Sequence, residues 1–369
     1  MERLNDEKRR DKMRGMNKRD KRDKRNNRNT RFKGMRTLRG VSVLLMLLSL
    51  MMLTSCGQGT DIRIGVGSEK GVYYNYAQKI KEIEGTWATL ELKTTAGSAA
   101  SLRLLQKGFL EAAIVQSDVL DSADKGTGVF IKDAIGDKRT YSAACGLYTE
   151  AVQIVVRKDS DIKNVDDLTG KVVSVGEEQS GVIQNAEQIL QVFGISFSDI
   201  QVKHLSFEDS ANALRKKEID AFFCTAGAPT PAVAELFRDS EVRLLSLQGE
   251  DIKRIRKHYP GYTSCTIQAG TYEKQDEDVY TVGVRAVLVV ANHLDKVTVK
   301  KLTETIYTNA GSLNRDIAGE GDMTAEKAVE SIVIPFHSGA STYLLSQGAK
   351  VEVDKNGEKN DGAYGSQDE

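Results

Sequence analysis

The sequence has few of the residues that bind metals or act as nucleophiles: its 369 residues include four cysteines and four histidines. Cys145, Cys224 and Cys265 lie far apart, and no two cysteines form a Cys-x-x-Cys pair, so none has metal-ligand spacing. With Cys56 set aside, the odd number that remains allows at most one disulfide bond. We therefore expect buried free thiols, no metal and no cofactor.

Catalytic signatures are also absent from the sequence. There is no Gly-x-Ser-x-Gly motif, and the glycines of the segment 65–71 have neither P-loop nor dinucleotide-binding spacing. The pairs Asp166–Asp167 and Glu177–Glu178 are adjacent, so their carboxylates point opposite ways on a strand and make poor acid–base partners. These absences predict a binding protein and not an enzyme. The alternative, an exported enzyme, would need a titratable pair in its cleft.

Only one long hydrophobic run is present, 41–53. A helix of that length spans about 20 Å, short of a hydrocarbon core of about 30 Å. Basic residues precede the run, and Leu53-Thr54-Ser55-Cys56 follows it, as in an export signal. The ending resembles a bacterial lipobox, so we expect residues 1–55 to be a signal peptide and Cys56 to carry a lipid on the outer face of the cytoplasmic membrane. The alternative is a plain N-terminal membrane anchor.

The net charge of zero hides an asymmetry between the two ends of the chain. Residues 1–40 hold 17 basic and 6 acidic residues, whereas the rest holds 35 basic and 46 acidic residues. An acidic body argues against nucleic acid as a partner. The basic stretch precedes the signal and would be removed with it, or Met35 is the true start.

Beyond residue 60, short apolar strands alternate with helical segments, which predicts an open and largely parallel α/β sheet. The residue pattern predicts strands at 62–66, 87–95, 112–115, 152–156, 172–175, 200–205, 219–224 and 279–290. It predicts helices at 72–84, 101–105, 181–190, 210–217, 232–237, 297–312 and 325–331. The polar tail from about Lys350 is predicted to be disordered.

Five loops share one design, in which a strand is followed by small polar residues and the start of a helix. They are Gly67-Ser68, Ala96-Gly97-Ser98, Gln116-Ser117-Asp118, Gln179-Ser180-Gly181 and Thr225-Ala226-Gly227. Helix N-termini present unpaired N–H groups that bind carboxylates, and glycine lets a ligand approach the backbone. The set predicts a small anionic or zwitterionic ligand. Glu150 could receive the ammonium group of an amino acid, or it could cap a crossing point of the chain.

Longer motifs carry a family resemblance that covers about 61–348. They are IGVGSEKGVYYNYA, TTAGSAASLRLLQKG, AAIVQSDVL, LYTEAVQIVVRKDSDIKNVDDLTGKVVSVGEEQSG, IDAFFCTAGAPTPAV and IPFHSGASTYLLSQGA. In this order they resemble the TAXI family, the extracytoplasmic solute receptors of tripartite, ATP-independent (TRAP-type) transporters. The resemblance implies a receptor that captures a small carboxylate or an amino acid, such as glutamate or glutamine, and passes it to a membrane permease.

The implied fold is α/β and two-lobed, of the periplasmic-binding-protein type II, with the ligand cleft between the lobes. We expect residues 56–60 to be a lipidated linker, 61–150 to begin lobe 1, 151–262 to form lobe 2, 263–348 to return to lobe 1, and 349–369 to be disordered. We expect a monomer. The ligand-binding residues expected are Ser68, Tyr73, Tyr74, Ser98, Gln116, Ser117, Asp118, Glu150, Gln179, Ser180, Gly181 and Gly227.

The first loop departs from the family pattern, because Glu69 and Lys70 stand where small residues are usual. Lys70 could bind a ligand carboxylate, or both side chains could point outward. Arg157 follows a strand and is interpreted as structural. A sensory or partner-binding lipoprotein with the same fold and no transport role remains the alternative function.

Overall fold

The computed structural model describes residues 60–354 except for 84, 86 and 318. The predicted signal peptide, Cys56, most of the linker and residues 355–369 lie outside the described residues. Among the residues described, no helix combines the length and the hydropathy needed to cross a bilayer.

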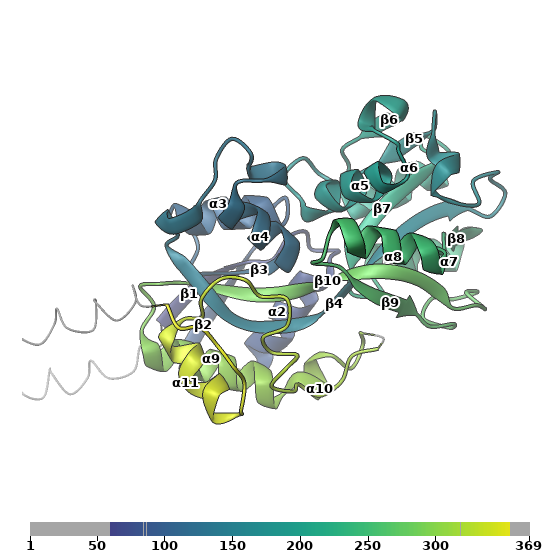
Figure 1. The fold of residues 1–369 in the computed structure, drawn as a ribbon. Helices are drawn as coiled ribbons and strands as arrows, with labels where there is room; N and C mark the ends of the chain where they lie inside the picture. Colours follow the sequence, from purple (N-terminus) through teal and green to yellow (C-terminus); the bar gives the residue numbers. More distant parts are fainter. Residues whose placement is uncertain (1–59, 84, 86, 318, 355–369) are drawn as a thin grey trace, which may run out of the picture. The chain divides into compact units, whose positions relative to one another are not determined.

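The strands alternate with helices along most of the chain (Figure 1). The strands are β1 (Thr60–Gly65), β2 (Ala88–Lys93), β3 (Ala112–Gln116), β4 (Tyr141–Arg157), β5 (Val172–Ser174), β6 (Gln201–Lys203), β7 (Ala221–Ala226), β8 (Val242–Leu244), β9 (Thr263–Ile267) and β10 (Val279–Ala291). The helices are α2 (Val72–Ile83), α3 (Ser98–Gln106), α4 (Ser117–Lys125), α5 (Gly181–Val192), α6 (Phe207–Arg215), α7 (Pro231–Asp239), α8 (Gly249–His258), α9 (Lys296–Thr308), α10 (Ala310–Leu313) and α11 (Ser338–Ser346). Each predicted strand overlaps an observed strand, but β8, β9, α8 and α11 were not predicted, and only the start of α4 was.

The ten strands form one mixed sheet in the order β2-β1-β3-β10-β4-β7-β5-β6, with β8 paired to β4 and β9 to β10. The strands β1, β2 and β3, here called the first strand set, are parallel to one another. The strands β5, β6 and β7, the second strand set, are also parallel. Between the sets, β10 and β4 pair antiparallel with each other and with their outer neighbours. The α/β class is confirmed, but the prediction of a largely parallel sheet is wrong at its centre.

Strand β4 belongs to both sides of the sheet. Its residues from Tyr141 to Ala151 pair with β10, and those from Ala151 to Val156 pair with β7. Fifteen of its 17 residues are buried, as expected for a strand covered on both faces. The prediction of a strand at 152–156 found only its second half, because small and polar residues dilute the apolar pattern before Ala151.

The described residues belong to one compact unit with two apolar clusters. Adjacent side chains of β7 point to opposite faces of the sheet, so Phe222 packs in the larger cluster and Phe223 in the smaller one. The expected free thiols are confirmed: Cys145 and Cys224 are buried, Cys265 is half-buried, and none of the three is in a disulfide.

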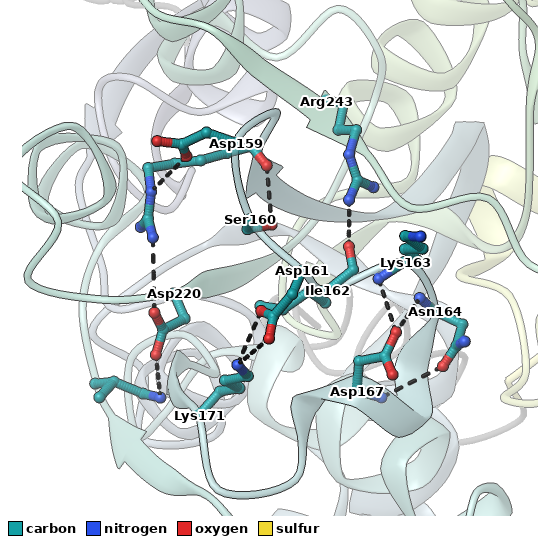
Figure 2. Close-up of polar contacts among 12 residues, drawn as sticks. Asp159, Ser160, Asp161, Ile162, Lys163, Asn164, Asp167, Lys171, Asp220 and Arg243 are labelled. Carbon is teal, nitrogen blue, oxygen red and sulfur yellow. Dashed lines mark hydrogen bonds and ion pairs between the residues drawn. The ribbon is translucent and has the colours of Figure 1, made fainter.

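The segment that leaves β4 for β5 is held by local polar contacts (Figure 2). Arg157 pairs with Asp159 at 3.2 Å and with Asp220 at 3.8 Å, and Lys171 pairs with Asp161 at 2.9 Å. Asp167 forms a capping box with Asn164 and does not act together with its neighbour Asp166. These residues lie outside the pocket described below, so the structural interpretation of Arg157 is confirmed.

The segment after α10 packs against β4. Residues 325–331 form a series of turns instead of the predicted helix. The carbonyl group of Ala328 accepts a hydrogen bond from the β4 amide of Gly146 at 2.8 Å, so tertiary pairing replaces the local helix. The disorder predicted from about Lys350 does not begin there. Val353 forms a bridge with Phe336, and buried Asp354 accepts a hydrogen bond from Ser142 at 2.8 Å.

A buried ion pair fastens this segment to the two central strands. Arg285 of β10 contacts Glu320 at 3.3 Å, and their side chains are 4% and 6% exposed. Glu320 also accepts from the β4 amide of Thr149 at 2.7 Å, and Arg285 donates to the carbonyl of Leu147 at 3.1 Å. Removing one partner of a buried pair leaves the other charge uncompensated.

We therefore expect Glu320→Ala to lower the free energy of unfolding by about 3 kcal/mol. The midpoint of urea unfolding, followed by circular dichroism, measures the change. Glu250→Ala is the control, because its pair with Lys253 is on the surface and its midpoint should not move. Equal midpoints for the two variants would contradict a role for the buried pair.

Candidate functional site

The carboxyl ends of the two strand sets meet at the middle of β4. Strand β3 ends at Gln116, opposite Ala286 of β10, and β7 ends at Ala226, opposite Ala151 of β4. Because β3 and β7 run in opposite directions, the loops that follow each set converge near Glu150. Ligands of open α/β sheets bind beyond such carboxyl ends.

A cavity of about 60 Å³ lies at this convergence. It has room for only a few water-sized groups. Its lining comes from the ends of β1, β2, β3, β5 and β7, from the middle of β4, and from the chain after β6. The lining residues are Val66, Gly67, Ser68, Gly71, Val72, Tyr73, Ala96, Gly97, Ser98, Gln116, Glu150, Gly176, Glu177, Ser180, Gly181, Val182, Leu205, Ser206, Phe207, Thr225 and Ala226.

Three helices begin at this pocket without a side-chain cap. The N-cap residues Gly97 of α3, Gln116 of α4 and Ser180 of α5 form no side-chain hydrogen bond to the first turn of their helix. Uncapped first turns leave N–H groups and the positive end of the helix dipole available to a ligand. The pocket therefore offers several donors suited to a carboxylate.

Glu150 is the charged group at the base of the pocket. It is 2% exposed, and its Oε2 accepts a hydrogen bond from the Tyr73 hydroxyl at 2.6 Å. Within the described ranges no lysine, arginine or histidine forms an ion pair with Glu150, and none lines the pocket. Burial, together with the nearby charge of Asp118, raises the pKa of Glu150 well above its ordinary value. A positively charged ligand group would relieve this uncompensated burial.

Other polar groups of the pocket also lack protein partners. Gln116 Oε1 and Thr225 Oγ1 are buried acceptors with no hydrogen bond in the part of the chain that the structure describes. Burial raises the pKa of Glu177, which lies beside the pocket after β5. Buried polar atoms are normally paired, so their presence here is typical of a binding site.

The two sides of the pocket touch each other along the starts of α3, α4 and α5. The amide of Ala100 donates to the carbonyl of Gln179 at 3.2 Å. A Cβ atom at Gly181 would lie 1.5 Å from Gln116 Oε1, and one at Gly97 would lie 2.9 Å from Ser180 Cα. The close approach therefore depends on glycine at both positions.

Seven of the residues expected at the site line this pocket: Ser68, Tyr73, Ser98, Gln116, Glu150, Ser180 and Gly181. The other five do not line it. Tyr74 packs against the core. The side chain of Gln179 is exposed, and only its backbone carbonyl takes part, as the acceptor for the amide of Ala100. Gly227 is buried against Tyr148. Ser117 and Asp118 face a second cavity instead. Glu69 is exposed, and Lys70 pairs with Glu235 at 3.1 Å outside the pocket.

Sequence reasoning missed Glu177, Leu205 and Phe207 among the lining residues, and it named Thr225 only as part of a loop and not as a binding residue. Glu177 and Thr225 carried a usable signal, because both stand at or just after the end of a strand of the second set. Leu205 and Phe207 carried none, because an apolar residue in a short loop is equally compatible with the core.

The NMT1-like family matches residues 64–348, and the chain belongs to this family. It is similar to the alkanesulfonate-binding protein SsuA from Xanthomonas axonopodis pv. citri, with 16% identity, coverage of 79% of this chain and 86% of that chain, and a TM-score of 0.46. An ancestral arginine-binding protein shows 15% identity, coverage of 71% and 100%, and a TM-score of 0.44. The GluR0 ligand-binding core from Nostoc punctiforme shows 13% identity, coverage of 70% and 98%, and a TM-score of 0.42.

The pH dependence of unfolding should carry the signature of Glu150. Because its pKa is raised in the folded state, the folded protein holds a proton that the unfolded chain has lost, and stability falls as pH rises above about 4.3. Glu150→Gln keeps an acceptor for Tyr73 and buries no charge. In urea titrations we expect the variant to match the wild type near pH 4 and to become the more stable protein as pH increases to 8.

Glu111→Gln provides a control of opposite sign. The Arg63 guanidinium lowers the pKa of Glu111, so this carboxylate stabilises the fold above its unfolded pKa and the contribution disappears as pH falls. The variant should be less stable than the wild type at pH 7, and the difference should shrink as pH falls below about 4.3. A Glu150→Gln protein less stable than the wild type at pH 8 would contradict the interpretation of Glu150.

Proposed function

We propose that this member of the NMT1-like family is an extracytoplasmic solute-binding protein that captures a small amino acid of the glutamate or glutamine type. The proposal gives it a type II periplasmic-binding-protein fold, with lobe 1 formed by 61–150 and 263–348 and lobe 2 by 151–262. The supporting observation is the buried carboxylate of Glu150, which lines the pocket and has no cationic partner among the described side chains.

The two halves of an amino acid match the two kinds of group in the pocket. Its ammonium group would bind Glu150 and form a buried charge-assisted hydrogen bond. Its carboxylate would bind at the uncapped starts of α3 and α5. Gln116 Oε1 and Thr225 Oγ1 would accept or exchange hydrogen bonds with the rest of the solute. The absence of lysine and arginine from the lining disfavours a solute that carries only negative charge.

The size of the cavity implies that the protein opens to admit its solute. A volume of about 60 Å³ is smaller than an amino acid with a four-carbon or five-carbon skeleton requires. On opening, the contact between the starts of α3 and α5 would break first. The hinge would be formed by β4 and β10, because these two strands run through both halves of the sheet. A bound solute would favour the closed state because it contacts both sides.

The transport role rests on the sequence resemblance to TAXI receptors. In this proposal the protein is held to the membrane by a lipid on Cys56 and delivers its solute to a TRAP-type permease. A permease gene beside the gene for this chain would support transport. A signalling gene in that place would favour the sensory alternative.

Isothermal titration calorimetry tests the solute class. The solutes are glutamate, glutamine and aspartate, together with N-acetylglutamate, in which the amino group is acylated and carries no charge. We expect an amino acid to bind and Glu150→Gln to weaken it about 30-fold or more, because a buried charged hydrogen bond is worth roughly 2–5 kcal/mol. Glu178→Gln is the matched control, because this neighbouring side chain is exposed and outside the lining. Tight binding of N-acetylglutamate, or unchanged affinity in Glu150→Gln, would refute the role assigned to this carboxylate.

Closure can be tested with glycine substitutions at two helix starts. Gly181→Ala places a methyl group against Gln116 and Val119 across the pocket, whereas Gly249→Ala occupies open space at the first residue of α8. We expect Gly181→Ala to bind solute about tenfold more weakly and to remain more expanded than the wild type in solution X-ray scattering with solute present. Gly249→Ala should behave as the wild type, and identical scattering for all three proteins would argue against closure.

A further inference from the structure

A second cavity, of about 890 Å³, lies outside the pocket at Glu150. Its walls come from α4, the chain after α4, α5, the turn that follows α8 and the segment near 331–333 (Figure 1). Ser117 and Asp118 line it, while the preceding residue Gln116 lines the first pocket. The start of α4 therefore separates the two spaces.

A chain of buried polar side chains forms one wall of this cavity. Asp118 Oδ2 accepts from Gln184 Nε2 at 2.9 Å and from Asn185 Nδ2 at 2.8 Å. Asn185 Nδ2 also donates to the Tyr262 hydroxyl at 2.7 Å, which donates to Gln188 Oε1 at 2.8 Å. Gln184 is 1% exposed and Asn185 is fully buried, so this wall is a built structure and not a chance surface contact.

The wall has spare acceptors. Asp118 Oδ1, Gln184 Oε1 and Asn185 Oδ1 are buried, and within the residues described none of the three has a hydrogen-bond partner. Each unpaired buried acceptor is unfavourable by roughly 1–3 kcal/mol, so the arrangement favours a ligand rich in N–H donors. Asp118 and Gln184 line the cavity, and a group that presents several N–H bonds at once, such as an ammonium or a guanidinium, suits their two unpaired oxygens.

The charges around the cavity favour a cation. Asp118 and Glu187 supply carboxylates, whereas the charges of Lys125 and Asp121 offset each other in an ion pair at 2.8 Å. Burial raises the pKa of Asp118 to about 6, so the group is mostly ionised at neutral pH although it forms no ion pair with a described side chain. The rim is apolar, with Ile131 75% exposed and Val333 54% exposed. Two such side chains can cover a short hydrocarbon stem.

We propose that this cavity binds a small organic cation, in which an ammonium or guanidinium group contacts Asp118 and Gln184 and a short apolar stem lies against Ile131, Val333 and Tyr259. The site is separate from the pocket at Glu150 and does not depend on the identity of the solute there.

Occupancy of the second site would influence the first pocket. The cation would contact α4 on one side and α5 on the other, and the starts of these helices also border the first pocket. A ligand that contacts both helices stabilises the arrangement in which they touch. Binding at the two sites would therefore be coupled, and by reciprocity each ligand would change the affinity of the other by the same factor.

Calorimetry and thermal unfolding of the purified full-length protein, with agmatine and n-butylammonium as probes, test this site. Butanol and butyrate are the matched neutral and anionic probes. We expect the two cations to bind and to raise the unfolding temperature, and the neutral and anionic probes to do neither. Asp118→Asn should weaken cation binding at least tenfold, whereas Glu250→Gln, on α8 outside the cavity, should leave it unchanged.

Two further variants locate the bound cation and guard against misfolding. Glu150→Gln should weaken cation binding less than Asp118→Asn does, so a larger loss in Glu150→Gln than in Asp118→Asn would place the cation in the first pocket and overturn the proposal. Ile131→Arg adds a positive charge at the exposed rim without touching the polar wall, and it should weaken binding in a fully folded protein. Equal response to butanol and n-butylammonium, or no cation binding at millimolar concentration, would also overturn it.

Discussion

The structure depends on β4 being shared by both halves of the sheet. Ala151 is paired on one side with β10 and on the other with β7, so the ends of two oppositely directed strand sets meet beside it. Glu150, the preceding residue, is thereby buried among loops from both sets. A charge in this position is expensive for the free protein, and no described cation compensates it. The same backbone pairing that unites the sheet therefore creates the polar centre of the pocket.

The pocket and the second cavity follow the same physical rule with different chemistry. Each contains buried acceptors that the rest of the described protein leaves unpaired, Gln116 and Thr225 in one and Asp118 and Gln184 in the other. Such groups lower the stability of the free protein and are positioned before a ligand arrives. Unpaired buried atoms also occur elsewhere, as at Arg285 Nε, but there the side chain is held by an ion pair with Glu320.

The sequence predicted the α/β class and the strands because short apolar runs ended in glycine and small polar residues. It did not predict the mixed centre of the sheet, since the direction of a strand is decided by its partners and not by its own residues. The helix prediction at 325–331 failed because the Ala328 carbonyl accepts from Gly146 of a distant strand, a contact that the local sequence does not show. At the site, residues that follow strands directly were found more readily than Leu205 and Phe207. Ser117 and Asp118 were correctly placed at a helix start, but only the folded chain shows which cavity they face.

The position of β10 in the chain affects how the protein is made. This strand lies between β3 and β4 in the sheet, yet it begins only at Val279, after the whole second strand set has been synthesised. Until it emerges from the ribosome, β3 has β1 on one side but lacks its neighbour on the other, and the first strand set cannot be joined to the second. Closing so long a loop is slow, and an unpaired strand edge invites aggregation in the meantime. The nascent chain therefore stays incompletely folded until late in synthesis, a state that suits passage through a narrow translocation channel and calls for protection by chaperones.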